Sequence, residues 1–209
     1  MVITEKTFER LPSDKRRRFL SEAYKEFSLH SYESASITHL VKNLGIAKGS
    51  VYQYFKDKQS LYLYLIDDAF NQVEQLLDKT CPVLTNFGFR DWYENYLMVY
   101  LKILLSFPIY GILFDKNQHE TSTKIKGHYL HLLGEKSMLQ RTIQSLPELS
   151  LYEVTQLKLG PLFLFSLLVE QSGQDIEVYL ESGATLELPT ETILELCDQF
   201  VHPLPIFDT

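Results

Sequence analysis

Five residues near position 50 are of types, and at a spacing, suited to reading DNA. Val51 and Phe55 are four residues apart, so on a helix they face the same way and can pack inward. The residues left to point elsewhere are Lys48, Gly49, Ser50, Tyr52 and Gln53. Lys48, Ser50 and Gln53 can exchange hydrogen bonds with base edges, and Gly49 lets the backbone come close. We therefore predict that this helix enters a major groove.

A preceding helix and a glycine turn are expected to position that segment. Ser36 can cap a helix N-terminus with its hydroxyl, and Gly45 can take the left-handed conformation of a tight corner. Ile46 can then fill the core between the two helices. Between cap and glycine, one apolar stripe recurs at helical spacing, formed by Ile37, Leu40, Val41 and Leu44. The pattern predicts a helix-turn-helix over about residues 36–55.

Further DNA contacts are predicted around this pair of helices. Thr38 joins the base readers from the first helix. Tyr52, Tyr54 and Lys58 suit phosphate contact, and Lys58 also lies at a helix N-terminus, where backbone amides attract anions. Ser36 both caps its helix and can touch phosphate. For Tyr54, packing against the core is an equally open alternative.

The segment 32–61 resembles the DNA-binding domain of the TetR family of bacterial transcriptional regulators, and the resemblance is specific over about residues 8–66. Three positions depart from the family pattern: Ala35 replaces threonine, Val41 replaces a small alanine, and Ala47 replaces the serine that usually caps the second helix. The ordered matches are Ser36, Ile37, Leu40, Gly45, Ile46, Lys48, Gly49, Ser50, Val51, Tyr52, Tyr54, Phe55, Lys58 and Leu61.

Charge is distributed unevenly along the 209 residues, whose net charge is −7. Residues 1–60 hold 11 Lys and Arg against 7 Asp and Glu, whereas residues 61–209 hold 9 against 20. The basic part is the part with the helix-turn-helix, which supports a DNA-facing end on an acidic body. We expect a DNA-binding domain over residues 1–56 and an effector-binding and dimerisation domain over residues 57–209.

Helical periodicity dominates the whole chain, which predicts an all-α fold of nine or ten helices in two bundles. Helices are expected from residue 13, and over 58–79, 90–107, 109–116, 121–145, 150–171 and 190–202. The sequence has two cysteines without CxxC spacing, and it shows neither an apolar leader nor an apolar run long enough for a bilayer. We therefore expect a cytoplasmic protein without a membrane partner.

A helix-turn-helix usually binds a palindromic operator as a homodimer, with its two readers about 34 Å apart. The resemblance implies that the last two long helices form an intermolecular four-helix bundle. The alternative is that their apolar residues are ordinary core within one chain. The predicted interface residues are Leu162, Leu164, Leu168, Ile193, Leu196 and Phe200.

The resemblance also implies a cavity in the body for a small effector that releases the operator. Aromatic walls with phenolic hydroxyls would favour a flat, hydrophobic or amphipathic compound, although such a stripe is more often plain core. The candidate lining residues are Trp92, Tyr96, Tyr100, Phe107, Tyr110, Phe114, Tyr129, Phe163 and Phe165.

Catalytic motifs are not found, since the sequence has no glycine-rich phosphate loop, nucleophile elbow or HExxH. His128 and His131, with His119 or Glu135, could form a metal site, but such spacing is common on helix surfaces, and we expect neither a metal nor a cofactor. The sequence favours a ligand-responsive repressor. The alternative is an effector-free or protein-partner-controlled helical regulator.

Overall fold

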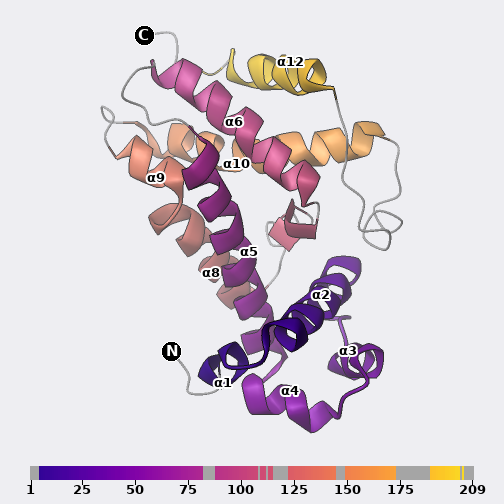
Figure 1. The fold of residues 1–209 in the computed structure, drawn as a ribbon. Coiled ribbons are helices and arrows are strands. Elements are labelled where there is room, and N and C mark those ends of the chain that lie inside the picture. Colours follow the sequence, from indigo (N-terminus) through magenta and orange to yellow (C-terminus); the bar gives the residue numbers. More distant parts are fainter. Residues whose placement is uncertain are drawn as a thin grey trace.

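The computed structural model describes residues 5–81, 88–107, 109–111, 113–114, 122–144, 149–172, 189–202 and 204, and the regular structure in these ranges is helical (Figure 1). The helices are α1 (Glu5–Glu9), α2 (Ser13–Leu29), α3 (Ile37–Leu44), α4 (Lys48–Tyr54), α5 (Lys58–Thr80), α6 (Phe89–Ser106), α8 (Thr123–Glu135), α9 (Met138–Ile143), α10 (Leu151–Ser172) and α12 (Thr190–Val201). The all-α prediction is confirmed.

Helices α1 to α4 form a small lobe at one end of the molecule (Figure 1). Its core is aromatic: the ring centroid of Phe8 lies 5.0 Å from that of Phe19 and 5.1 Å from that of Phe55. Phe8 belongs to α1, which was not predicted, because the first helix was expected to begin at residue 13. Five residues are too short for a detectable period, and α1 is held by packing of Phe8 rather than by its own propensity.

Helix α5 joins this lobe to the body and runs through both (Figure 1). Asp57 begins it with a capping box: its carboxylate accepts the Ser60 backbone N–H at 2.7 Å, and the Ser60 hydroxyl accepts the Asp57 N–H at 3.1 Å. Helix α5 (Lys58–Thr80) is thus one unbroken helix of 23 residues that the lobe and the body share.

The region predicted as one helix over 121–145 contains two helices, α8 and α9. Ser137 separates them, because its hydroxyl accepts the Gln140 backbone N–H at 3.1 Å and thereby caps α9. Glu74 of α5 accepts the Met138 N–H at 2.6 Å. Two backbone N–H groups at the start of α9 therefore donate to side chains and not to backbone carbonyls of α8, so the chain starts a new helix there.

Proline at position 161 lies inside α10, where it cannot donate a hydrogen bond to the Leu157 carbonyl four residues earlier. The Tyr93 hydroxyl of α6 donates to that carbonyl at 2.7 Å. Gly160 permits the close approach, because a Cβ there would lie 2.7 Å from both the Tyr93 hydroxyl and a Phe200 ring carbon. Helix α6 is therefore central to the body, because α10 and α12 both pack on it.

We expect Tyr93→Phe to lower the free energy of unfolding by about 1–3 kcal/mol, because it leaves the buried Leu157 carbonyl without a donor. Urea denaturation measures the change. The matched control is Tyr52→Phe, at an exposed tyrosine, where the change should stay within about 0.5 kcal/mol. Equal effects of the two substitutions would contradict a role for the Tyr93 hydroxyl.

Candidate nucleic-acid interface

The corner between α3 and α4 has the geometry that the sequence predicts. Ser36 caps α3 by accepting the His39 backbone N–H at 3.3 Å. Gly45 has φ 68° and ψ 33°, and its N–H bonds to the Lys42 carbonyl at 3.2 Å while the Ile46 N–H bonds to the Val41 carbonyl at 3.1 Å. This pair of bonds is a Schellman motif, which ends α3 and turns the chain into α4.

Helix α4 begins without a side-chain cap. Ala47 has the extended backbone of an N-cap residue, φ −72° and ψ 143°, but its methyl group accepts no hydrogen bond. Val51 and Phe55 are buried beneath α4 and fix its inner face. The departure at Ala47 therefore leaves the start of α4 without a side-chain acceptor, and the Ser50 N–H bonds to the Ala47 carbonyl at 2.9 Å instead.

We expect Ala47→Ser to stabilise the protein by about 0.5–2 kcal/mol, because serine supplies the missing acceptor in a backbone conformation that already suits it. Thermal unfolding checks this. Ala47→Val serves as the control without an acceptor and should give no gain. A stabilisation by valine as large as that by serine would refute the capping explanation.

The outer face of the pair carries the predicted readers. Thr38, Lys48, Gly49 and Gln53 are exposed, as is Tyr52, whose side chain keeps 43% of its accessible surface. The Lys48 ammonium donates to the Thr38 hydroxyl at 3.0 Å, which ties the second helix to the first. Helices α3 and α4, which carry these residues, lie at the end of the molecule remote from the body (Figure 1).

Ser50 and Tyr54 are half-buried at the edge of this face. The Tyr54 ring lies 5.7 Å from the Phe8 ring, so the packing alternative accounts for much of its surface. Ser36 donates its backbone N–H to the Glu26 carboxylate at 2.7 Å and uses its hydroxyl for the cap. Direct DNA contact by these three residues stays a prediction.

Lys58 has a structural role that the sequence did not reveal. Its ammonium donates to three carbonyls of the loop before α3, those of Tyr32 at 2.6 Å, Glu33 at 3.0 Å and Ala35 at 3.1 Å. It also lies 4.7 Å from the centre of the Tyr32 ring. All three donors are thus used inside the domain. The contact predicted for Lys58 with phosphate stays a prediction, while its observed bonds hold the loop that positions α3.

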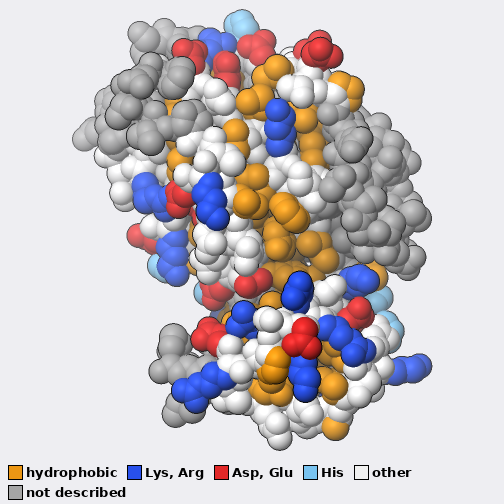
Figure 2. Space-filling view, viewed as in Figure 1, with side chains coloured by type: hydrophobic (Ala, Val, Ile, Leu, Met, Phe, Trp, Pro, Cys, Tyr) orange, Lys and Arg blue, Asp and Glu red, His pale blue; other side chains and the backbone are white. Residues whose placement is uncertain are grey.

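The basic run at the start of α2 is partly engaged within the protein. Arg16 donates to the Glu9 carbonyl at 2.9 Å, and Arg18 donates to the Leu44 carbonyl at 3.3 Å, at the end of α3. In the view of Figure 2, Lys and Arg side chains of this lobe are interleaved with acidic and hydrophobic ones. The positive charge on this side of the lobe is therefore spread out rather than gathered in one patch.

Most residues predicted to line an effector pocket are packed in the body. Trp92 stacks on Tyr96 with ring centroids 5.4 Å apart, and Tyr96 lies 5.7 Å from Tyr100. Burial raises the pKa of the Tyr96 and Tyr100 hydroxyls, so they stay neutral. Phe114, Tyr129 and Phe165 are also buried, whereas Phe107 and Phe163 are exposed on the surface. A pocket lined by these residues stays a prediction.

A groove of about 540 Å³ lies where α2 meets α5, and Tyr110 is the member of the predicted set that lines it. In its wall, the Tyr24 hydroxyl donates to Asp68 at 2.8 Å and to the Leu65 carbonyl at 3.1 Å. Burial raises the pKa of the Asp68 carboxyl. Arg16 and Arg17 also line the groove, so its surface is more polar than the apolar wall that the sequence predicted.

Four of the residues predicted at a dimer interface, Leu162, Leu164, Leu168 and Ile193, are buried inside the single chain. Leu196 and Phe200 are partly buried. Among the described side chains of α10 and α12, the large apolar ones that are exposed are Phe163, at 54% of its surface, and Leu194, at 46%. The sequence could not separate these faces, because α10 is apolar around most of its circumference.

The histidines considered as metal ligands are not gathered in the part of the chain that the structure covers. His128 of α8 pairs with Asp67 of α5 at 2.9 Å, and His119 lies outside the described residues. A different set, Glu26, His30 and His39, has potential ligand atoms within 4.8 Å of one another. The i, i+4 spacing of Glu26 and His30 was a visible signal, but the approach of His39 depends on the fold.

None of the described helices is long and apolar enough to cross a membrane.

Residues 19–65 match the sequence model of a protein family described as "Bacterial regulatory proteins, tetR family". The chain is 32% identical over 65 residues to an uncharacterized HTH-type transcriptional regulator of Bacillus subtilis, covering 31% of this chain and 33% of that protein. It is 31% identical over 102 residues to an HTH-type transcriptional regulator of Staphylococcus aureus, covering 46% and 49% respectively. These matches span half or less of the relatives' length.

Similarity of the whole fold extends much further. A TetR family transcriptional regulator from Chloroflexus aurantiacus superposes with a TM-score of 0.72 at 25% identity, covering 95% of both chains. The regulator FadR from Bacillus subtilis, solved in complex with stearoyl-CoA, gives a TM-score of 0.56 at 14% identity, covering 87% of this chain and 96% of FadR. The likeness to FadR concerns the fold alone.

Proposed function

We propose that this chain, a member of the TetR family of bacterial regulatory proteins, is a cytoplasmic repressor. In this proposal it binds a palindromic operator as a homodimer, and a hydrophobic or amphipathic small molecule releases it from the DNA. The observation that carries the proposal is a helix that exposes Lys48, Gly49, Tyr52 and Gln53. Its inner face is locked by Val51 and Phe55. Side chains with donors and acceptors on a rigid helix are what base reading in a major groove requires.

The homodimer is proposed to form through the outer faces of α10 and α12, around Phe163 and Leu194. Phe163 also lies 6.1 Å from the Phe200 ring, which would extend the same apolar surface. We expect sedimentation to give about twice the 24.4 kDa chain mass, and Phe163→Glu to weaken the dimer by burying a charge. Leu130→Glu, at an exposed leucine of α8, is the matched control. If the control alone dissociates the dimer, the interface lies elsewhere.

The route from body to reader is proposed to be α5 with its contacts to α2. Tyr24 of α2 bonds to two groups of α5, the Leu65 carbonyl and Asp68, so the lower lobe follows the middle of α5. His128 and Lys124 of α8 also reach α5, at Asp67 and Gln59. A ligand that favours one arrangement of the body would thereby change the spacing of the two readers in a dimer.

The effector is proposed to bind in the helical body. That FadR, a protein of the same fold, was solved with stearoyl-CoA supports a long apolar or amphipathic ligand as the first class to test. The close stacking of Trp92 on Tyr96 means that a ligand between them must separate packed rings. This packing also favours, as a second candidate, a regulator whose body answers to a protein partner rather than to a small molecule.

Fluorescence anisotropy of the purified protein with the DNA flanking its own gene tests the proposal. The titration is run at two salt concentrations, because phosphate contacts weaken as salt rises. Each is repeated with fatty acids, acyl-CoA thioesters and aromatic hydrophobic compounds. Tight, salt-sensitive binding that one compound relieves supports the repressor. Tight binding that no compound relieves supports control by a partner, and no specific binding refutes both.

A further inference from the structure

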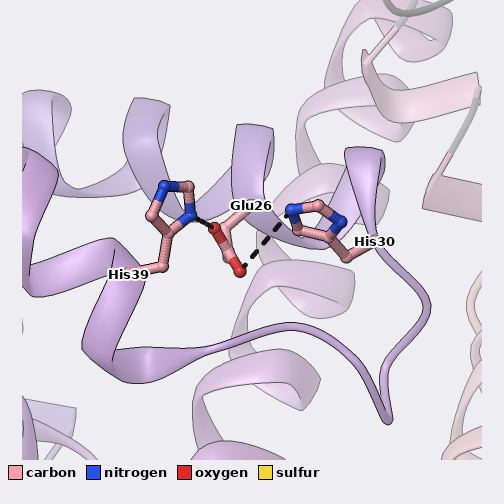
Figure 3. A group of neighbouring side chains, drawn as sticks. All are labelled: Glu26, His30 and His39. Atoms are coloured by element: carbon pink, nitrogen blue, oxygen red, sulfur yellow. Dashed lines mark hydrogen bonds and ion pairs between the residues drawn. The ribbon is translucent and has the colours of Figure 1, made fainter.

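Glu26, His30 and His39 converge where α2 ends and α3 begins (Figure 3). The Glu26 carboxylate lies 2.6 Å from the His39 Nδ1 and 4.0 Å from the His30 Nε2. His30 is the residue that ends α2, and His39 lies in the first turn of α3. Three potential ligand atoms from two helices thus lie within 4.8 Å of one another.

The carboxylate is fixed while the imidazoles are accessible. The Glu26 side chain is only 4% exposed, and its Oε1 accepts the Ser36 backbone N–H at 2.7 Å. The His30 and His39 side chains are 45% and 53% exposed. A hydrogen bond from the backbone to a ligating carboxylate is the kind of support that orients metal ligands in proteins. Solvent can therefore deliver an ion to a site whose anionic ligand is already held.

We propose that Glu26, His30 and His39 bind a divalent transition-metal ion of the Zn²⁺ class, with water completing the coordination. Two imidazole nitrogens and one carboxylate oxygen form a donor set that Zn²⁺ accepts, at bond lengths of about 2.0–2.2 Å. Such bonds place tetrahedral ligands about 3.3 Å apart. The present contacts of 2.6 and 4.0 Å lie on either side of that separation, so metal binding requires the side chains to rotate from their present positions.

Metal binding would brace the loop between α2 and α3. Lys58 already holds this loop through three of its carbonyls. An ion joining His30 to His39 closes the same loop at its two ends, next to Thr38 on the reading face. Metal would therefore raise the thermal stability of the lower lobe. A second expectation rests on the proposed function: the bound metal would raise operator affinity, because it would reduce the motion of α3.

The test is a titration of the chelator-treated full chain with ZnCl2 against a chromophoric zinc indicator. We expect one tight site per chain, weakened about 10- to 100-fold or more in His30→Ala and in His39→Ala. Both residues are exposed, so these variants should fold, which circular dichroism checks. His131→Ala, at an exposed histidine of α8, is the matched control and should bind as the native chain does. MgCl2, which prefers oxygen ligands, should not compete.

Native-like zinc affinity in both variants, or an equal loss in the His131 control, would overturn the site. Thermal unfolding provides a second readout: Zn²⁺ should raise the melting temperature of the native chain but not of the two variants. Operator binding is measured separately with and without Zn²⁺. If the metal binds and stabilises the chain but operator affinity is unchanged, the link to DNA reading is refuted. If no operator binds at all, only the proposed function fails.

Discussion

Lys48→Ala and Tyr52→Ala should each abolish tight operator binding while leaving the dimer folded. A good bidentate base contact is worth about 1–3 kcal/mol, and a hydrogen bond to a charged group such as a phosphate about 1.5–3 kcal/mol. In a two-fold dimer every substitution is present in both half-sites, so the expected loss is about 2–6 kcal/mol, or roughly 30-fold to more than 10⁴-fold in Kd. Both side chains are exposed, so the free energy of unfolding should change by less than about 0.5 kcal/mol.

The measurement is anisotropy with the operator at two salt concentrations, and the control is Lys102→Ala. Lys102 is an exposed lysine of α6 in the body, so the variant has the same loss of charge far from the reading face. It should bind within about twofold of the native protein. Retention of tight binding by both reader variants would show that α4 does not read the operator.

The elements with local signals were predicted well from the sequence. Ser36 and Gly45 delimit α3 through bonds to residues at most five positions away, so their roles could be inferred from residue type and spacing. The start of α5 at Lys58, where a helix was expected to begin, has an equally local cause in the Asp57 cap. Here the prediction and the structure agree, because the physical causes lie within a few residues of the observed feature.

Features that depend on residues far apart along the chain could not be predicted from the sequence. The bonds of Lys58 reach back more than twenty positions to the loop before α3. The break before α9 involves Glu74 of α5, and the carbonyl left by Pro161 is satisfied by Tyr93 of α6. In each case a side chain from another helix supplies the missing partner, and no periodicity along the chain records which helix that is.

The burial of the predicted dimer residues has a related cause. Hydrophobic residues recur on most sides of α10, so spacing alone could not tell an inward face from an outward one. Packing against α6 and α12 decides it, leaving Phe163 outside and Leu162 inside. The aromatic stripe of α6 poses the same problem, because stacked core rings and pocket walls have the same composition.

Glu74→Gln should change how stability depends on pH. Burial raises the pKa of this carboxyl to about 7 from the usual 4.5, even though the Met138 N–H and Arg141 favour its charged form. Between these values the folded protein holds a proton that the unfolded chain has released. Stability contributed by Glu74 is therefore lost as pH rises from about 4.5 to 7, by up to about 3 kcal/mol.

Glutamine can still accept the Met138 N–H but carries no charge to bury. The variant should thus be more stable than the native protein at pH 8, by about 1–3 kcal/mol, and should lose that advantage at pH 5. Urea denaturation at the two pH values measures the difference. Asp78→Asn, at an exposed partner of Arg141, is the control and should show little pH-dependent change between pH 5 and 8. An advantage that is equal at both pH values would mean that protonation of Glu74 does not control how α5 holds α9.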